Sequence, residues 1–147
     1  MEITIKTERI AKRAISIEDL IKIVRRELKP RSQEWHTRNY FLISFILRGA
    51  SFTDIAYLTP TNIKKGALTY RRRKTRKELR VKILPELSTL FSLYAGTNSK
   101  YLLPVLPSNT IEDGLKAKKL LMQWIKTSNK YLGRIAENCR IEDEVTT

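Results

Sequence analysis

The stretch Arg71–Arg80, RRRKTRKELR, is the part of the chain best suited to bind a polyanion. It holds seven cations and one acid, so these ten residues contribute +6 of the formal net charge of +14. Lysine and arginine at this density bind nucleic acid well, because each neutralised phosphate releases a condensed counterion. A solvated surface that binds nothing is the plainer alternative. The charge of the whole chain makes nucleic acid the first candidate partner and an anionic membrane surface the second.

Residues that alternate between apolar and polar flank the basic stretch and predict a β-hairpin over residues 67–84. Its turn is expected near Thr75–Lys77. Because alternate residues of a strand face opposite ways, we expect Tyr70, Arg72 and Lys74 to share one face of the hairpin and Arg71 and Arg73 to share the other. A rigid hairpin tip can hold cations against DNA, whereas a flexible tail loses entropy when it becomes ordered. The predicted phosphate contacts are Arg71, Arg72, Arg73, Lys74, Arg76 and Lys77.

Three isolated residues could also take part in chemistry. Arg48 follows an apolar run and precedes Gly49, so it can stabilise a helix C-terminus or clamp an oxyanion. His36 is the only histidine and has no second metal ligand near it in sequence, which favours a packing or surface role. Cys139 is the only cysteine and is expected to be a small core residue. We therefore expect no disulfide framework, no metal site and no cofactor.

Capping residues and helix breakers define the helices that would position these side chains. Ser16 with Asp19, Ser51 with Asp54, and Thr110 with Asp113 have the spacing of helix starts. Pro30, Gly49 and Pro60 predict helix ends, and Pro85 suits a first helical turn. The expected helices cover residues 17–29, 33–47, 52–58, 86–95, 111–126 and 128–138.

The apolar positions predict which side of each helix faces the core. In the first helix the inward face is expected to comprise Ile17, Leu20, Ile21, Val24 and Leu28, with Ile15 packing on Leu20 as a staple. The run NYFLISFIL is apolar nearly all round and predicts a central buried helix. Near the end of the chain the expected core residues are Leu121, Trp124, Ile125, Leu132, Ile135 and Ala136.

These elements predict a mainly α fold with a small antiparallel β-sheet or hairpin, of the α+β class. Residues 1–13 read as an entry segment or linker, and residues 14–147 read as one domain. The longest apolar stretch, YFLISFIL, is too short to span a bilayer, and the first residues lack the apolar region of a signal peptide. We expect a cytoplasmic, bacterial protein.

Several of these segments together resemble the catalytic domain of tyrosine recombinases, the integrases of phages and conjugative transposons, especially those of the Bacteroides type. The resemblance covers roughly residues 13–147. It rests on RAISIEDLIKIVRRELK (13–29), LRGASFTDIAYLTPTNI (47–63), YRRRKTRKELRVKI (70–83) and YLLPVL (101–106). It implies DNA integration without metal or ATP. In that family a lysine on a β-hairpin acts as general acid on the leaving 5′ oxygen of DNA, and Lys74 matches this lysine.

The chain also departs from the family pattern. The usual TGLRxSEL motif aligns with RGASFTDI, so Ser51 occupies the arginine position and Arg48 lies three residues earlier. Arg48 is the candidate to supply the guanidinium, and Asp54 would be structural. The family's His-x-x-Arg box and tyrosine nucleophile have no match here, since no histidine follows His36 and Tyr131 lies too early. We therefore expect the N-terminal part of a catalytic domain, unable to cut DNA by itself.

Three functions follow from the sequence. The first is a DNA-binding part of a tyrosine recombinase, which could self-associate because the family works as a tetramer and because an incomplete domain would expose an apolar patch. The second is a basic nucleic-acid-binding module that never had catalysis. The third is a platform for an acidic protein. The DNA target is not readable, because phosphate contacts carry no sequence information.

Overall fold

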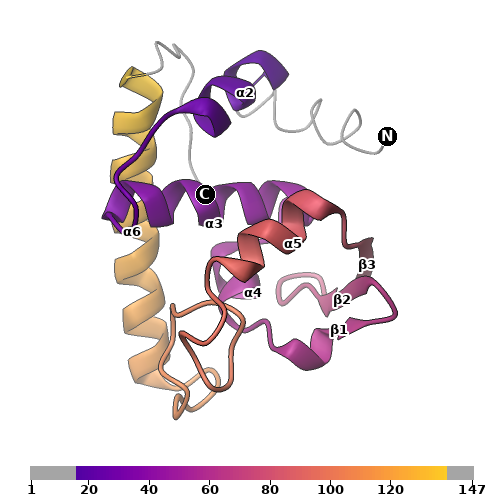
Figure 1. Cartoon of the computed structure of the whole chain (residues 1–147). Helices are drawn as coiled ribbons and strands as arrows, with labels where there is room; N and C mark the ends of the chain where they lie inside the picture. Colours follow the sequence, from indigo (N-terminus) through magenta and orange to yellow (C-terminus); the bar gives the residue numbers. More distant parts are fainter. Residues whose placement is uncertain (1–15, 139–147) are drawn as a thin grey trace. The chain divides into compact units, whose positions relative to one another are not determined.

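The computed structural model describes residues 16–138, which belong to two compact units. Unit 1 combines the chain up to Gly49 with the chain from Ile125 onward, and unit 2 spans Ala50–Trp124. Within residues 16–138 there are five α-helices and one three-stranded antiparallel sheet (Figure 1), which confirms the α+β class. The predicted entry segment, the Ile15 staple and Cys139 lie outside the described residues.

Helix α2 (Ile17–Arg25) and helix α3 (Gln33–Ile46) begin at serine caps in unit 1. The Ser16 Oγ accepts the N–H of Asp19, as predicted, and the Ser32 Oγ accepts the N–H of Trp35. Helix α2 ends at Arg25 rather than near Pro30, because Arg26 adopts an extended conformation. The guanidinium of Arg38 donates to the Arg26 carbonyl at 2.6 Å, which gives this helix end a side-chain partner.

The core of unit 1 brings α2 and α3 together with the second half of α6 (Leu115–Asn138). It is made of Ile23, Phe41, Leu132, Ile135 and Ala136. The prediction for Leu132, Ile135 and Ala136 is confirmed. The inward face predicted for α2 is wrong in part: Leu20 and Leu28 are partly buried against the core, but the buried residue is Ile23.

The other apolar residues of α2 remain at the surface. Ile17, Ile21 and Val24 are 44%, 43% and 49% exposed. The helix carries two apolar stripes, and the partners in unit 1 bury the one that contains Ile23. The predicted self-association, which was not assigned to these residues, stays a prediction.

Helix α3 is the central buried helix predicted from its composition. Its buried residues include Tyr40, Phe41, Ile43 and Phe45. The helix is closed by two residues in the left-handed region, Arg48 at φ 63° and Gly49 at φ 77°. The Gly49 N–H donates to the Ser44 carbonyl at 2.8 Å, so Gly49 ends the helix as predicted.

Unit 2 begins with α4 (Phe52–Ala56) and a 3-10 turn η1 (Pro60–Asn62). The sheet follows, with strands β1 (Ile63–Lys64), β2 (Ala67–Arg71) and β3 (Glu78–Lys82) in the order β1-β2-β3. The hairpin is therefore confirmed, and β1 is a strand that the sequence did not predict. Helix α5 (Pro85–Ser92) starts with proline in its first turn, as expected.

Residues 93–114 contain no helix or strand yet contribute to the core of unit 2. Tyr94, Tyr101, Leu103, Val105 and Leu106 are each at most 4% exposed. The Asn98 side chain stabilises this segment by accepting the N–H groups of Lys100 and Tyr101 and donating to the Leu106 carbonyl. The Leu102 N–H donates to the Leu58 carbonyl at 2.8 Å.

Helix α6 runs without interruption from Leu115 to Asn138 (Figure 1), so the two helices predicted at 111–126 and 128–138 are one. The helix start predicted at Thr110 and Asp113 is also wrong, because Asp113 has φ 60° and the Gly114 carbonyl accepts the N–H of Lys118. Of the core residues predicted for this region, Leu121 is buried and Trp124 and Ile125 are half-buried. None of the helices in residues 16–138 has the length and apolar character needed to cross a membrane.

Candidate nucleic-acid interface

One face of the sheet is cationic. Along β3, Glu78, Arg80 and Lys82 are exposed, whereas Val81 is buried and Leu79 half-buried. The register places Arg80 opposite Thr69 and Lys82 opposite Ala67, and Ala67 also lies opposite Lys64 of β1. Paired positions point to the same side of a sheet. We define the basic sheet face as Lys64, Arg71, Arg80 and Lys82.

Little negative charge offsets the basic sheet face. Glu78 is the one acidic residue in β1, β2 and β3, and it lies opposite Arg71. The Arg71 guanidinium and the Glu78 carboxylate are 3.9 Å apart, and both side chains are more than 60% exposed. Exposed pairs at this distance are weak and screened by salt. The face therefore keeps a strong positive charge that is accessible to solvent.

The hairpin loop adds further cations at one end of the sheet. The Arg72 N–H donates to the Lys77 carbonyl at 2.9 Å, and the Arg76 N–H donates back to the Arg72 carbonyl. Because β2 ends at Arg71, the alternation predicted to continue to Lys74 is wrong, and Lys74 lies in the turn itself. We define the loop cations as the three exposed residues Lys74, Arg76 and Lys77.

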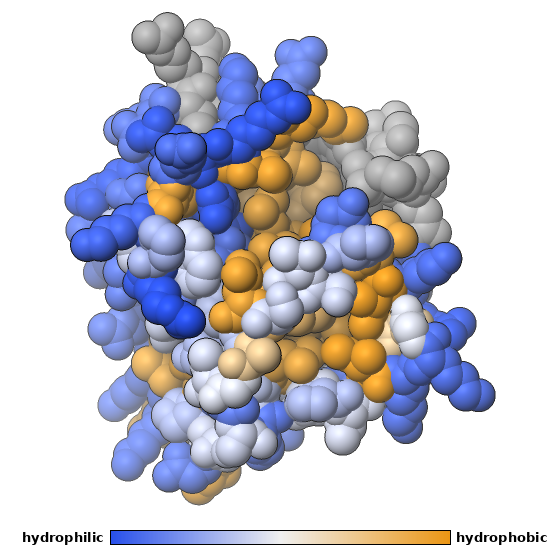
Figure 2. Space-filling model, viewed as in Figure 1, coloured by the Kyte–Doolittle hydropathy of each residue, from blue (hydrophilic) through white to orange (hydrophobic). Residues whose placement is uncertain are grey.

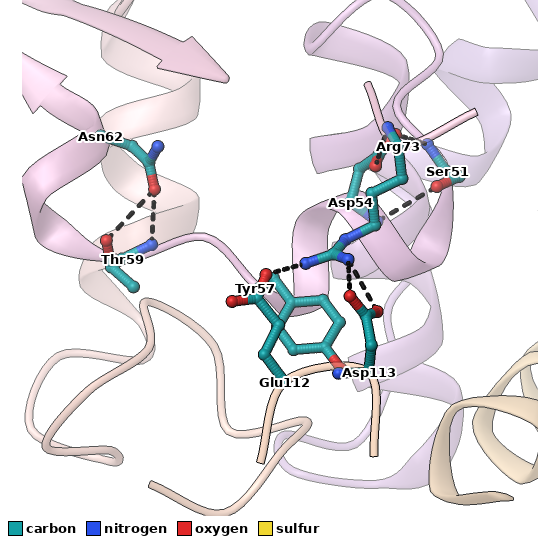
Figure 3. A network of polar contacts seen from close by, with 8 residues as sticks. All are labelled: Ser51, Asp54, Tyr57, Thr59, Asn62, Arg73, Glu112 and Asp113. Atoms are coloured by element: carbon teal, nitrogen blue, oxygen red, sulfur yellow. Dashed lines mark hydrogen bonds and ion pairs between the residues drawn. The ribbon is translucent and has the colours of Figure 1, made fainter. Parts of the chain in front are cut away.

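Arg73 differs from the loop cations because its side chain binds acids of the same unit (Figure 3). Its guanidinium donates to the Asp113 carboxylate at 2.8 and 3.0 Å and to the Glu112 carboxylate. It also lies over the Tyr57 ring, 4.0 Å from the centroid. The Tyr57 hydroxyl accepts the Asp113 N–H at 3.0 Å, which completes a network between α4, the hairpin loop and the turn before α6.

The charge of Arg73 is therefore already partnered. Partial burial lowers the pKa of Arg73, but the hydrogen bonds and charges of Glu112 and Asp113 outweigh burial and raise it overall. A phosphate would have to displace two carboxylates to bind this guanidinium. These contacts favour a structural role for Arg73 over the phosphate contact predicted from the sequence.

The side chain of Asp54 holds the hairpin loop by binding the loop backbone. Its carboxylate accepts the Ser51 N–H at 3.3 Å with one oxygen and the Arg73 N–H at 3.1 Å with the other. The Ser51 Oγ accepts the Asp54 N–H at 3.1 Å, so the predicted capping box is present. Asp54 is only 8% exposed, and it thus joins the start of α4 to the hairpin loop.

Replacing Arg73 by glutamine should lower the free energy of unfolding by about 1 kcal/mol, because the ion pairs and the ring contact are lost from partly exposed groups. Lys74→Gln is the matched control in the same loop, and should change stability by less than about 0.5 kcal/mol. Urea unfolding of both variants measures the difference. Equal values for the two variants would contradict the network.

The remaining candidate residues have separate settings. Arg48 is half-buried at the end of α3 in unit 1, in the position predicted for a helix C-terminal cation. Ser51, which aligns with the family's arginine, caps α4. His36 is half-buried between the rings of Trp35 and Tyr40, and burial followed by the charge of Arg31 lowers its pKa. This setting agrees with a packing role.

Sequence reasoning missed Lys64 and Lys82 as members of the cationic surface. Both lie outside the basic run, and the signal that could have identified them is their pairing register, since each is opposite Ala67. Among the described residues no group of three or more His, Cys, Asp or Glu side chains could hold a metal ion. Comparison of the chain with family models, curated proteins and solved structures finds no match.

Proposed function

We propose that this chain binds DNA through the basic sheet face and the loop cations. The observation that carries the proposal is the register of β1, β2 and β3, which gathers four exposed cations on one side of a rigid sheet. The hairpin loop extends the same charge with three more exposed cations. A preformed surface of this kind binds phosphates without an ordering cost, and it reads charge rather than sequence.

We further propose that the chain is the N-terminal part of a tyrosine recombinase catalytic domain. The support is the sequence resemblance together with the position of Lys74, which is exposed in the turn of a hairpin beside other cations. In this role the Lys74 ammonium would donate a proton to the leaving 5′ oxygen. In-frame codons after Thr147 that encode a His-x-x-Arg box and a tyrosine would support it; a non-catalytic binding module predicts none.

The DNA-binding proposal predicts a steep dependence on salt. The logarithm of the association constant should fall linearly with the logarithm of salt concentration, by about 0.9 for each phosphate contacted. The double variant Arg80→Gln/Lys82→Gln should reduce that slope by about 2 and weaken binding by roughly tenfold or more. Fluorescence anisotropy with a labelled duplex at several salt concentrations measures both quantities.

The control for this experiment removes two exposed cations that lie outside the sheet and the hairpin loop. Arg25→Gln/Lys29→Gln changes the net charge by the same amount in unit 1. It should leave the slope nearly unchanged. An affinity of the native chain that does not vary with salt would refute the proposal, and equal losses in the two double variants would show that only net charge matters.

A further inference from the structure

Helix α6 carries a second cationic surface in its second half, within unit 1. Lys126, Lys130 and Arg134 recur every four residues and are all exposed. Residues at this spacing lie on one face of a helix. Leu132 and Ile135 are fully buried on the other side, so the helix separates a core face from a cationic face. Figure 2 shows hydrophilic side chains along the left side of the view, where α6 runs in Figure 1.

These cations have little acidic compensation. Glu137 is the one acid between Ile125 and Asn138. Among the ion pairs of the described residues none includes Lys126, Lys130 or Arg134, although Arg134 lies over the Tyr131 ring at 5.2 Å. Like charges four residues apart repel one another on a helix. A bound polyanion would remove this repulsion.

Gly133 lies on the same face, about one turn after Lys130 and one turn before Glu137. Glycine disfavours a helix interior. A Cβ atom at Gly133 would meet no atom within 4 Å, and the residue is exposed, so no packing contact requires glycine here. Its missing side chain leaves the helix backbone beside Lys130 open to a close approach.

We propose that Lys126, Lys130, Gly133 and Arg134 form a second DNA-contact surface, which binds the phosphate backbone of duplex DNA. The surface belongs to unit 1, whereas the basic sheet face belongs to unit 2. The choice of DNA as the ligand rests on the proposed function. The charge of these three cations and their spacing along α6 are independent of that function. Neutral helix-forming substitutions at these positions should keep the fold, because the side chains are exposed.

The test compares four variants of the full chain in the same anisotropy assay. Lys126→Gln/Lys130→Gln should lower the salt slope by about 2 and weaken duplex binding by roughly tenfold or more, and its effect should add to that of Arg80→Gln/Lys82→Gln. Gly133→Glu should also weaken binding while the melting temperature stays the same or rises, which excludes unfolding as the cause. Arg25→Gln/Lys29→Gln is the control.

The outcomes separate this inference from the proposed function. If the native chain fails to bind DNA, the proposed function fails. If the sheet variant loses affinity but the helix variant matches the control, the α6 surface alone is refuted. A membrane role would also overturn the α6 proposal. It would be shown if the native chain bound phosphatidylserine vesicles and Lys126→Gln/Lys130→Gln lost that binding but kept duplex binding.

Discussion

Replacing Ile23 by alanine should lower the free energy of unfolding of unit 1 by about 3 kcal/mol. Ile23 is fully buried in a cluster with Phe41, Leu132 and Ile135. Truncation removes most of the side chain and leaves a cavity, and such changes typically cost about 2–5 kcal/mol. Chemical denaturation followed by circular dichroism measures the loss.

Ile21→Ala is the matched control, because it makes the same chemical change two residues away on the same helix. Ile21 is 43% exposed, so its truncation removes little buried surface and should cost less than about 1 kcal/mol. The sequence pattern alone predicted the reverse order, since it placed Ile21 in the core. A larger loss for Ile21→Ala than for Ile23→Ala would contradict the packing of α2.

Replacing Asp54 by alanine is expected to destabilise unit 2 by about 2–4 kcal/mol. The change removes the acceptors of two backbone N–H groups, those of Ser51 and Arg73, from a site where the carboxylate is 8% exposed. Loss of the cap bond to the Ser51 N–H typically costs about 1 kcal/mol, and the Arg73 N–H left without an acceptor adds about 1–3 kcal/mol. Hydrogen exchange at the Arg73 amide should also become faster, because the carboxylate oxygen that accepts its N–H is gone.

Two variants divide this effect into its parts. Asp54→Asn keeps one carbonyl oxygen of similar shape and should cost less than Asp54→Ala, since one of the two donors keeps an acceptor. Ser51→Ala removes only the acceptor of the Asp54 N–H and should cost about 1 kcal/mol without faster exchange at Arg73. If Ser51→Ala and Asp54→Ala were equally destabilising, Asp54 would act as a cap alone and would not hold the hairpin loop.

The cations of the basic run Arg71–Arg80 differ in their surroundings. Lys74, Arg76 and Lys77 are exposed at the loop, and Arg71 and Arg80 project from the sheet. Arg73 instead binds Glu112 and Asp113 from a segment about forty residues later. Identical residue types in one stretch thus have different surroundings, and only their neighbours in space distinguish the exposed cations from the paired one.

Local chemistry was predictable from the sequence by itself. The caps at Ser16 and Ser51, the closing glycine at Gly49 and the first-turn proline at Pro85 were all predicted. Each of these depends on residues within about four positions, where chain geometry leaves few choices. The alternation of Leu79 and Val81 with polar residues in β3 was predicted for the same reason.

Tertiary contacts decided what local pattern left open. Helix α2 has two apolar stripes of similar strength, and the one facing Phe41 and Leu132 is buried. Asp113 resembles a helix-start residue, yet it binds Arg73, and α6 begins only at Leu115. In each case two local solutions are close in free energy, and a partner distant in sequence selects one, because burial and ion pairing depend on which surfaces meet in space.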